Sequence, residues 1–310
     1  LAMLNQTEAS EFILLGLTDI QGLQHFFFIF FLLLYFASLL GNGVIVIMVI
    51  FEPRLHTPMY FLLGNLSCLD IFFSTVTVPK MLTGFLSGHQ PISFGGCLTQ
   101  LHFFHFLGST ETVLLATMAY DRYVAICNPL RYALVMSPRA CLLLAVASWS
   151  TGFVHAMMHL IMTAQLRFCG HNHVDHFFCD IKPLLNLACS STSLNMTLLN
   201  VVTTSIVLGP FVLIVLSYLY IISFIFQKVQ SQEGRWKAFS TCASHLTIVA
   251  LLYVPVLFNY TPPSSGSSSK RDARVSLMYS AVTPALNPLI YTLRNQEVRS
   301  ALKKMIERKL

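Results

Sequence analysis

The sequence predicts an all-α membrane protein, a seven-transmembrane helix bundle followed by a short amphipathic C-terminal interfacial helix. Of the 310 residues, 55% are hydrophobic and only 10% are charged, whereas a soluble domain carries about 25% charged residues. The apolar residues gather in seven segments, each near the roughly 20 residues that a helix needs to cross a bilayer. These observations exclude soluble, disordered, collagen-like and nucleic-acid-binding proteins.

The seven segments follow one another without an internal repeat or a second domain. The first lacks an upstream basic region and a cleavage site, so we expect it to serve as its own signal anchor. Polar residues interrupt the second and third segments, and prolines fall within the fifth, sixth and seventh. The expected spans are residues 26–51, 58–85, 97–127, 141–164, 198–226, 239–260 and 275–293.

A short amphipathic helix is expected after the seventh segment. Apolar side chains recur there at spacings of three and four residues, with basic side chains between them, which is typical of a helix lying on the cytosolic leaflet. The expected single domain, 1–310, therefore has an extracellular tail at 1–25, the bundle at 26–293 and a cytosolic helix at 294–310. The apolar positions of that helix are Val298, Ala301, Leu302, Met305 and Ile306.

The distribution of basic residues predicts the orientation. Thirteen of the 19 lysines and arginines lie on the side of the C-terminus, and the N-terminal tail has none. Because cytosolic loops carry the excess of Lys and Arg, we expect an extracellular N-terminus and a cytosolic C-terminus in the plasma membrane. Asn5 then lies in an extracellular glycosylation sequon, whereas the sequon at Asn65 lies inside a span and should stay unused.

Four of the eight cysteines fall on the expected extracellular side, where disulfides form. They are Cys97, Cys169, Cys179 and Cys189, and four cysteines allow three connectivities. The other four lie in spans or near the cytosol.

Two acidic residues fall near the middle of their spans, where a carboxylate is unfavourable without a partner. Asp70 and Glu111 could together hold a cation such as Na⁺, or one of them could stay protonated and donate a hydrogen bond. Asn42 and Asn287 are their expected polar neighbours. The alternative is that these groups only join helices by buried hydrogen bonds.

One face of the third span predicts a ligand pocket, because small and hydroxyl side chains alternate there with aromatic ones. No acidic residue lies between positions 103 and 110 to pair with an amine, so a neutral, largely apolar ligand fits better. Ordinary helix packing is the alternative for each apolar position. The candidate residues are Phe104, His105, Gly108, Ser109 and Thr112, with Val202, Thr203 and Ile206 on the fifth span and Tyr253, Val256, Leu257 and Tyr260 on the sixth.

Polar contact with the ligand is expected from His105, Ser109, Thr203 or Tyr260, with Tyr260 favoured. His105, His155 and His159 form a set that could bind a soft metal such as copper, although buried histidines more often satisfy hydrogen bonds. No metal is assigned.

Several sequence blocks resemble a known family. Met118 to Cys127, with Asp121-Arg122-Tyr123 at its centre, resembles the corresponding region of rhodopsin-like G-protein-coupled receptors. Together with the other blocks it is similar to the tetrapod-type odorant receptors of vertebrates, from about Glu11 to the last helix. Val254-Pro255 departs from the family pattern, so we expect a different bend in the sixth helix. The other blocks are Gly41-Asn42, residues 55–61, 176–180, Ser217-Tyr218, 237–246 and 284–291.

The resemblance implies a receptor rather than an enzyme. Its expected partners are a small volatile odorant, membrane lipid and a stimulatory-type olfactory G protein that raises cAMP in olfactory cilia; no nucleic acid is expected. It implies disulfides Cys97–Cys179 and Cys169–Cys189, and it favours sodium at the acidic pair. The coupling and switch residues it implies are Asp121, Arg122, Tyr123, Tyr218, Lys237, His245, Asn287, Pro288 and Tyr291.

Other classes of seven-helix protein fit the sequence less well. A retinal pump or opsin needs a lysine in the seventh span, and residues 275–293 contain none. A transporter would show related halves, and no repeat is present. Metalloprotease, nucleophile-elbow and phosphate-loop motifs are absent from the sequence, which argues against an enzyme.

Overall fold

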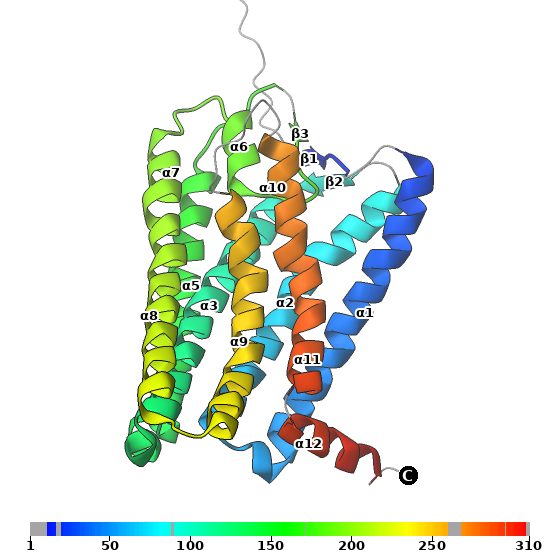
Figure 1. The fold of residues 1–310 in the computed structure, drawn as a ribbon. Helices are drawn as coiled ribbons and strands as arrows, with labels where there is room; N and C mark the ends of the chain where they lie inside the picture. Colours follow the sequence, from blue (N-terminus) through cyan, green and yellow to red (C-terminus); the bar gives the residue numbers. More distant parts are fainter. Residues whose placement is uncertain are drawn as a thin grey trace, which may run out of the picture.

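Seven spanning helices form one bundle, as predicted (Figure 1). The computed structural model describes residues 11–16, 20–87, 90–170, 172–259, 268–294 and 296–307. The first four spans are α1 (Gln21–Phe51), α2 (Pro58–Ser87), α3 (Phe94–Cys127) and α5 (Pro138–Ala164). The fifth joins α7 (Ser193–Leu198), η3 (Leu199–Thr203) and α8 (Thr204–Lys228), and the sixth is α9 (Gln232–Asn259). The seventh joins α10 (Ser268–Leu277), η4 (Met278–Val282) and α11 (Thr283–Arg294).

Shorter elements connect the spans. They are η1 (Pro53–Leu55), η2 (Pro129–Arg131), α4 (Tyr132–Val135) and α6 (Ile181–Leu187). The amphipathic helix predicted at the C-terminus is α12 (Gln296–Glu307), which lies across the end of the bundle (Figure 1). Val298 and Ala301 of α12 are buried, whereas Arg299 and Lys303 are exposed, in agreement with an amphipathic helix.

Two of the spans, α3 and α5, begin before the predicted positions because polar capping residues extend them. The Ser93 hydroxyl accepts a hydrogen bond from the backbone N–H of Gly96, and Ser137 does the same for Ala140. Such caps satisfy backbone donors that the first turn of a helix leaves free. Helix α1 begins at Gln21, before the predicted start of the first span at residue 26.

Five of the described helices are long and apolar enough to cross a membrane by length and composition alone. They correspond to α1, α2, α5, α7–η3–α8 and α9. The third and seventh spans are outside this set. The sequence of α3 is less apolar because it contains polar and acidic residues such as Glu111 and Asp121, which are buried where α3 packs against the neighbouring helices α2, α5, α8 and α9.

A small sheet, which the sequence did not predict, lies at one end of the bundle. Strand β1 (Glu11–Leu14) pairs in antiparallel fashion with β2 (Gln90–Ser93) and in parallel with β3 (His173–Val174), giving the order β2-β1-β3. Phe12 and Leu14 of β1 are buried in an apolar cluster that includes Cys97 and Cys179. We call this the disulfide end, and the opposite end the α12 end (Figure 1).

Two glycines allow helices to approach closely. A Cβ atom at Gly152 of α5 would overlap the Thr110 hydroxyl and lie 2.5 Å from the backbone carbonyl oxygen of Phe106 on α3. A Cβ at Gly41 of α1 would lie 2.8 Å from Pro288 in α11. The contacts of α3 with α5 and of α1 with α11 therefore depend on the absence of a side chain at these positions.

Candidate ligand and switch sites

One disulfide fastens the second loop of the disulfide end to the bundle, and a second closes a ring within that loop. Cys97 at the start of α3 is bonded to Cys179, and Cys169 is bonded to Cys189, as predicted. Their Cα atoms are 5.4 and 5.7 Å apart, within the ordinary range for disulfides. The first bond holds residues 177–180 against α3 and so covers the predicted ligand region.

An ion-pair contact supports this covering loop. Nε2 of His105 on α3 lies 3.4 Å from the Asp180 carboxylate, which also accepts a 2.7 Å hydrogen bond from the backbone N–H of Ile181. Burial alone would raise the pKa of Asp180. The nearby imidazoles of His105 and His176 and the backbone N–H of Ile181 together lower that pKa to about 2. The loop therefore keeps a carboxylate in its charged form directly above the third span.

We expect the stability of the folded protein to decrease in mild acid, with His176 as one cause. His176 is 2% exposed, and its burial lowers its pKa, although Asp180, Asp272 and a backbone hydrogen bond at Phe178 oppose the shift. Below about pH 6.5 the unfolded imidazole gains a proton that the buried one resists. Stability is therefore present above that pH and is lost below it, by at most about 1.4 kcal/mol per pH unit.

Thermal unfolding of the detergent-solubilised protein between about pH 7.5 and pH 5 measures this effect. His176→Gln should flatten the dependence of unfolding temperature on pH. The same substitution at exposed His56 should leave it unchanged. Equal slopes for His176→Gln and the parent protein would contradict the assignment.

Aromatic side chains surround the predicted pocket face of α3. Phe104 packs against Phe178 of the covering loop, with ring centroids 4.3 Å apart, and against Phe73 of α2 at 5.4 Å. Tyr279 of η4 completes the group, 5.9 Å from Phe104. A Cβ at Gly108 would lie 3.7 Å from the Phe73 ring. Phe73, Phe178 and Tyr279 were not predicted from the sequence, because only the packing of α2, the loop and η4 onto α3 brings them to this face.

A polar group lies beside these rings. Ser109 contacts His155, and both His155 and His159 contact the Thr203 hydroxyl of η3. Thr112 donates its hydroxyl proton to the backbone carbonyls of Ser109 and Ile206. The histidine rings predicted as a set do lie together, with His105 centred 5.3 Å from His159. Within the described part of the chain, however, no group of three or more His, Cys, Asp or Glu side chains is placed to hold a metal ion.

The remaining predicted pocket residues lie on the fifth and sixth spans. Val202 belongs to η3, and Val256 and Leu257, both half-buried, belong to α9. Tyr253 is 1% exposed and packs on Phe211 of α8 at 4.8 Å, and its hydroxyl has no hydrogen-bond partner among the described residues. The favoured polar contact, Tyr260, lies outside the described residues, and so does the sequon at Asn5.

The two central carboxyl groups are both fully buried. Asn287 of α11, one of the two expected polar neighbours, donates a 2.8 Å hydrogen bond to Asp70. The other, Asn42, donates to the backbone carbonyl of Pro284 at 2.9 Å, because the close approach of α1 to α11 brings that oxygen near. One oxygen of Asp70 and both oxygens of Glu111 have no hydrogen-bond partner in the described part of the chain.

The predicted switch residues gather toward the α12 end. Arg122 binds the carboxylate of Asp121 at 2.7 Å, and the hydroxyl of Tyr132 in α4 donates to the same carboxylate at 2.8 Å. Tyr132 was not anticipated, because it lies in a short helix outside the spans.

Neither Tyr218 nor Tyr291, two of the predicted switch residues, hydrogen-bonds to Arg122 in the described part of the structure. Tyr218 hydrogen-bonds to Nδ1 of His245 at 2.7 Å. The hydroxyl of Tyr291 is buried and has no hydrogen-bond partner among the described residues. Tyr123 is half-buried and packs edge-on against Tyr220. The side chain of Lys237 lies outside the described part of the structure.

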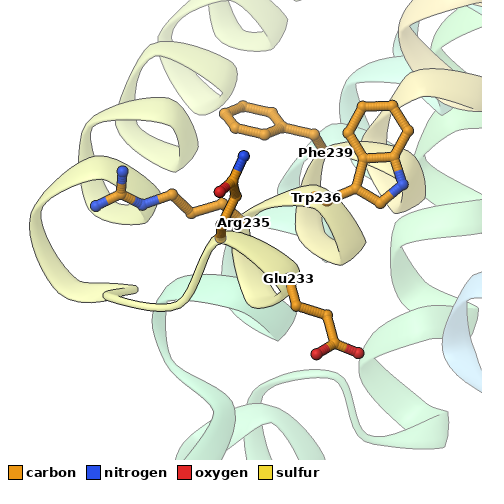
Figure 2. A pocket seen from close by; sticks show the side chains of 5 residues that line it. Glu233, Arg235, Trp236 and Phe239 are labelled. Carbon is orange, nitrogen blue, oxygen red and sulfur yellow. The ribbon is translucent and has the colours of Figure 1, made fainter.

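A surface pocket of about 370 Å³ lies at the start of α9, away from the predicted ligand residues. Its lining residues are Gln232, Glu233, Arg235, Trp236 and Phe239. Trp236 extends to the right of the view, whereas Phe239 and Arg235 extend to the left (Figure 2). The Arg235 guanidinium lies over the Phe226 ring of α8 and binds the carbonyl of Val229 at 2.7 Å. This contact fixes the turn between the fifth and sixth spans.

Comparisons with known proteins agree with this arrangement. The sequence pattern of the family described as olfactory receptor matches residues 31–309. Human olfactory receptor 12D1 is 58% identical, over 99% of this chain and 96% of its own. Human olfactory receptor 1A1 is 48% identical, over 99% of this chain and 98% of its own. The crystal structure of squid rhodopsin shares the fold, with a TM-score of 0.69 at 17% identity, over 94% of this chain and 88% of the rhodopsin chain.

Proposed function

Because this chain belongs to the olfactory receptor family, we propose that it binds a small, largely apolar volatile ligand inside the bundle and activates a stimulatory-type heterotrimeric G protein. Activation raises cAMP. Membership of the family makes the chain a multi-pass membrane receptor and not an enzyme. The proposal adds the class of ligand, the type of G protein and the site of action, olfactory cilia.

One observation carries the proposal: a single helix, α3, bears both a candidate pocket and a candidate switch. Near the disulfide end it presents Phe104, His105 and Ser109 beneath the covering loop, and near the α12 end it bears the Asp121–Arg122 pair. A helix that contacts four other spans can transmit a change in packing from one end to the other. This arrangement suits a receptor whose ligand and intracellular partner bind at opposite ends.

The proposed orientation places the disulfide end outside the cell and the α12 end in the cytosol. Disulfides form in the oxidising extracellular compartment. The exposed basic residues of α12 then face the anionic inner leaflet, where they are favourable.

Asp70 and Glu111 are proposed to bind Na⁺ or to share a proton. The three carboxyl oxygens that lack hydrogen-bond partners suit a hard cation, which prefers oxygen ligands. Protonation of one carboxyl group is the alternative, because two buried carboxylates repel each other.

Cells expressing the receptor test the proposed function. A panel of neutral volatile compounds should raise cAMP in cells that contain the stimulatory-type α subunit and have no effect in cells that lack it. Gly108→Leu should remove these responses by filling the space beside Phe73, with surface expression retained. Gly43→Leu is the matched control, because no atom lies within 4 Å of a Cβ there. A cAMP response that persists without the α subunit would contradict the proposed coupling.

A further inference from the structure

Four polar side chains form a continuous hydrogen-bonded path across the third, fourth and fifth spans. The Ser109 hydroxyl lies 2.7 Å from Nδ1 of His155, whose Nε2 lies 3.0 Å from the Thr203 hydroxyl. That hydroxyl also lies 2.9 Å from Nε2 of His159. We call the path Ser109, His155, Thr203 and His159 the histidine relay.

Burial and geometry indicate that the two relay imidazoles are not both charged. His155 is 3% exposed and His159 is 2% exposed, and burying a charge without a partner is unfavourable. The carboxylate above them, Asp180, contacts His105. The Nε2 atoms of His155 and His159 are also only 3.1 Å apart. Two N–H groups would repel there, so at least one nitrogen must present its lone pair.

With two neutral imidazoles the relay can take either of two directions. In the first, Ser109 donates to Nδ1 of His155, His155 donates from Nε2 to Thr203, and Thr203 donates to His159. In the second, His159 donates to Thr203, Thr203 donates to His155, and His155 donates from Nδ1 to Ser109. Each imidazole holds one ring proton in both cases and changes only its tautomer. The heavy-atom positions are the same, so both directions fit the observed distances.

The direction of the relay decides what Ser109 can offer to a ligand. In the first direction its proton is engaged, and its oxygen lone pairs can accept a hydrogen bond. In the second direction its proton is free to be donated. Ser109 is 7% exposed and follows Gly108, whose missing side chain leaves space beside the Phe73 ring. The end of the relay on α3 therefore lies next to the candidate pocket.

We propose that Ser109 binds the oxygen atom of the ligand, an inference that rests on the proposed function. The histidine relay lets the Ser109 hydroxyl act as hydrogen-bond donor or acceptor, as the ligand requires. The ligand class is then a small neutral molecule with one oxygen function, either a carbonyl group or a hydroxyl group. His155, Thr203 and His159 are positioning residues, which act through Ser109. An ionised acid would instead bring a negative charge among buried neutral side chains, which is unfavourable without a cationic partner.

Pairs of odorants that differ only in their oxygen-containing group test the proposal. The probes are ketones of six to ten carbons, each with the secondary alcohol of the same skeleton and the carboxylate of equal chain length. The readouts are cAMP and surface expression of the full-length receptor. We expect ketone and alcohol to activate the parent receptor within roughly tenfold of each other, a difference of about 1.4 kcal/mol at most, and the carboxylate to be much weaker.

The variants separate the relay from ordinary packing. Ser109→Ala and His155→Leu should each weaken both members of a pair by roughly 2- to 13-fold, the effect of losing one net hydrogen bond. His155→Gln should restore both responses, because an amide offers a donor and an acceptor. Ser148→Ala is the matched control, since this buried hydroxyl on α5 donates only to its own helix at Leu144.

Each outcome decides between distinct alternatives. The two-direction relay would be wrong if only the ketone or only the alcohol of every pair activated the parent receptor. It would also be wrong if Ser109→Ala weakened the response to only one of the two. If the parent receptor responds to odorants and every relay variant responds as well as the Ser148→Ala control, the relay hypothesis is wrong but the proposed function stands. A well-expressed parent receptor that responds to no neutral volatile would overturn the proposed function itself. Loss of every response on chelation would replace the relay by a metal site.

Discussion

Replacing Arg122 by alanine is expected to abolish ligand-driven cAMP while the receptor still reaches the cell surface. The Arg122 side chain is 12% exposed and binds Asp121 at 2.7 Å. In a receptor of this kind the arginine is expected to leave its carboxylate partner and meet the G protein when the sixth helix moves outward. Alanine removes that contact, whereas Asp121 keeps its hydrogen bond from Tyr132, so most of the local fold should remain.

The measurement compares cAMP with surface staining in the same cells. Arg54→Ala is the matched control, because this arginine also lies near the α12 end, has a 73% exposed side chain and makes only a 4.0 Å contact with Glu52. Full ligand-driven signalling by a well-expressed Arg122→Ala receptor would refute the role of Arg122. Loss of signalling in both variants would show that any loss of basic charge at this end is sufficient.

Gly152→Val is expected to prevent the receptor from folding. The new side chain would overlap Thr110, and its Cβ would lie 2.5 Å from the Phe106 carbonyl oxygen and 2.9 Å from the Thr110 backbone nitrogen. These are backbone atoms, which cannot turn aside as a flexible side chain can. The expected loss in the free energy of unfolding is therefore about 3 kcal/mol or more, at the upper end for overpacked sites.

Surface expression and thermal unfolding in detergent measure this loss. Gly209→Val in α8 is the control, because no atom lies within 4 Å of a Cβ at that position. The control should express normally, and Gly152→Val should be retained inside the cell. A Gly152→Val receptor with parental unfolding temperature would show that α3 and α5 can separate without harm.

The spanning helices could be predicted from the sequence because each depends on a local property, a run of apolar residues. Their first turns could not be placed by hydropathy, since Ser93 and Ser137 extend α3 and α5 through polar caps. A serine followed by proline, as in Ser137-Pro138, is a sequence signal for such a start. The sheet was missed for another reason: its strands have only four, four and two residues and come from distant parts of the chain.

The residues of the candidate site could be predicted from the sequence, but most of their hydrogen-bond partners could not. Ser109, Thr203 and the histidines were expected near the ligand, yet their connection depends on how α3, α5 and η3 are rotated about their axes. Asn42 shows the same limit. It lies in the predicted span and is buried, but it binds Pro284 because α1 meets α11 at Gly41. A periodic pattern identifies the buried face of a helix, whereas hydrogen-bond partners depend on the neighbouring helix.

The position of β1 determines when during synthesis this strand can make its native contacts. Ile13 donates a backbone hydrogen bond to Asn172, and Leu15 donates one to Val174, so the tail is completed by a loop that follows the fourth span. At about 5–20 residues per second, the ribosome makes that loop roughly 10–30 seconds after the tail. Throughout this interval Phe12 and Leu14 lack the cluster that buries them. Strand β1 is thus synthesised well before the loop that pairs with it, and a chaperone that shields Phe12 and Leu14 would act during this interval.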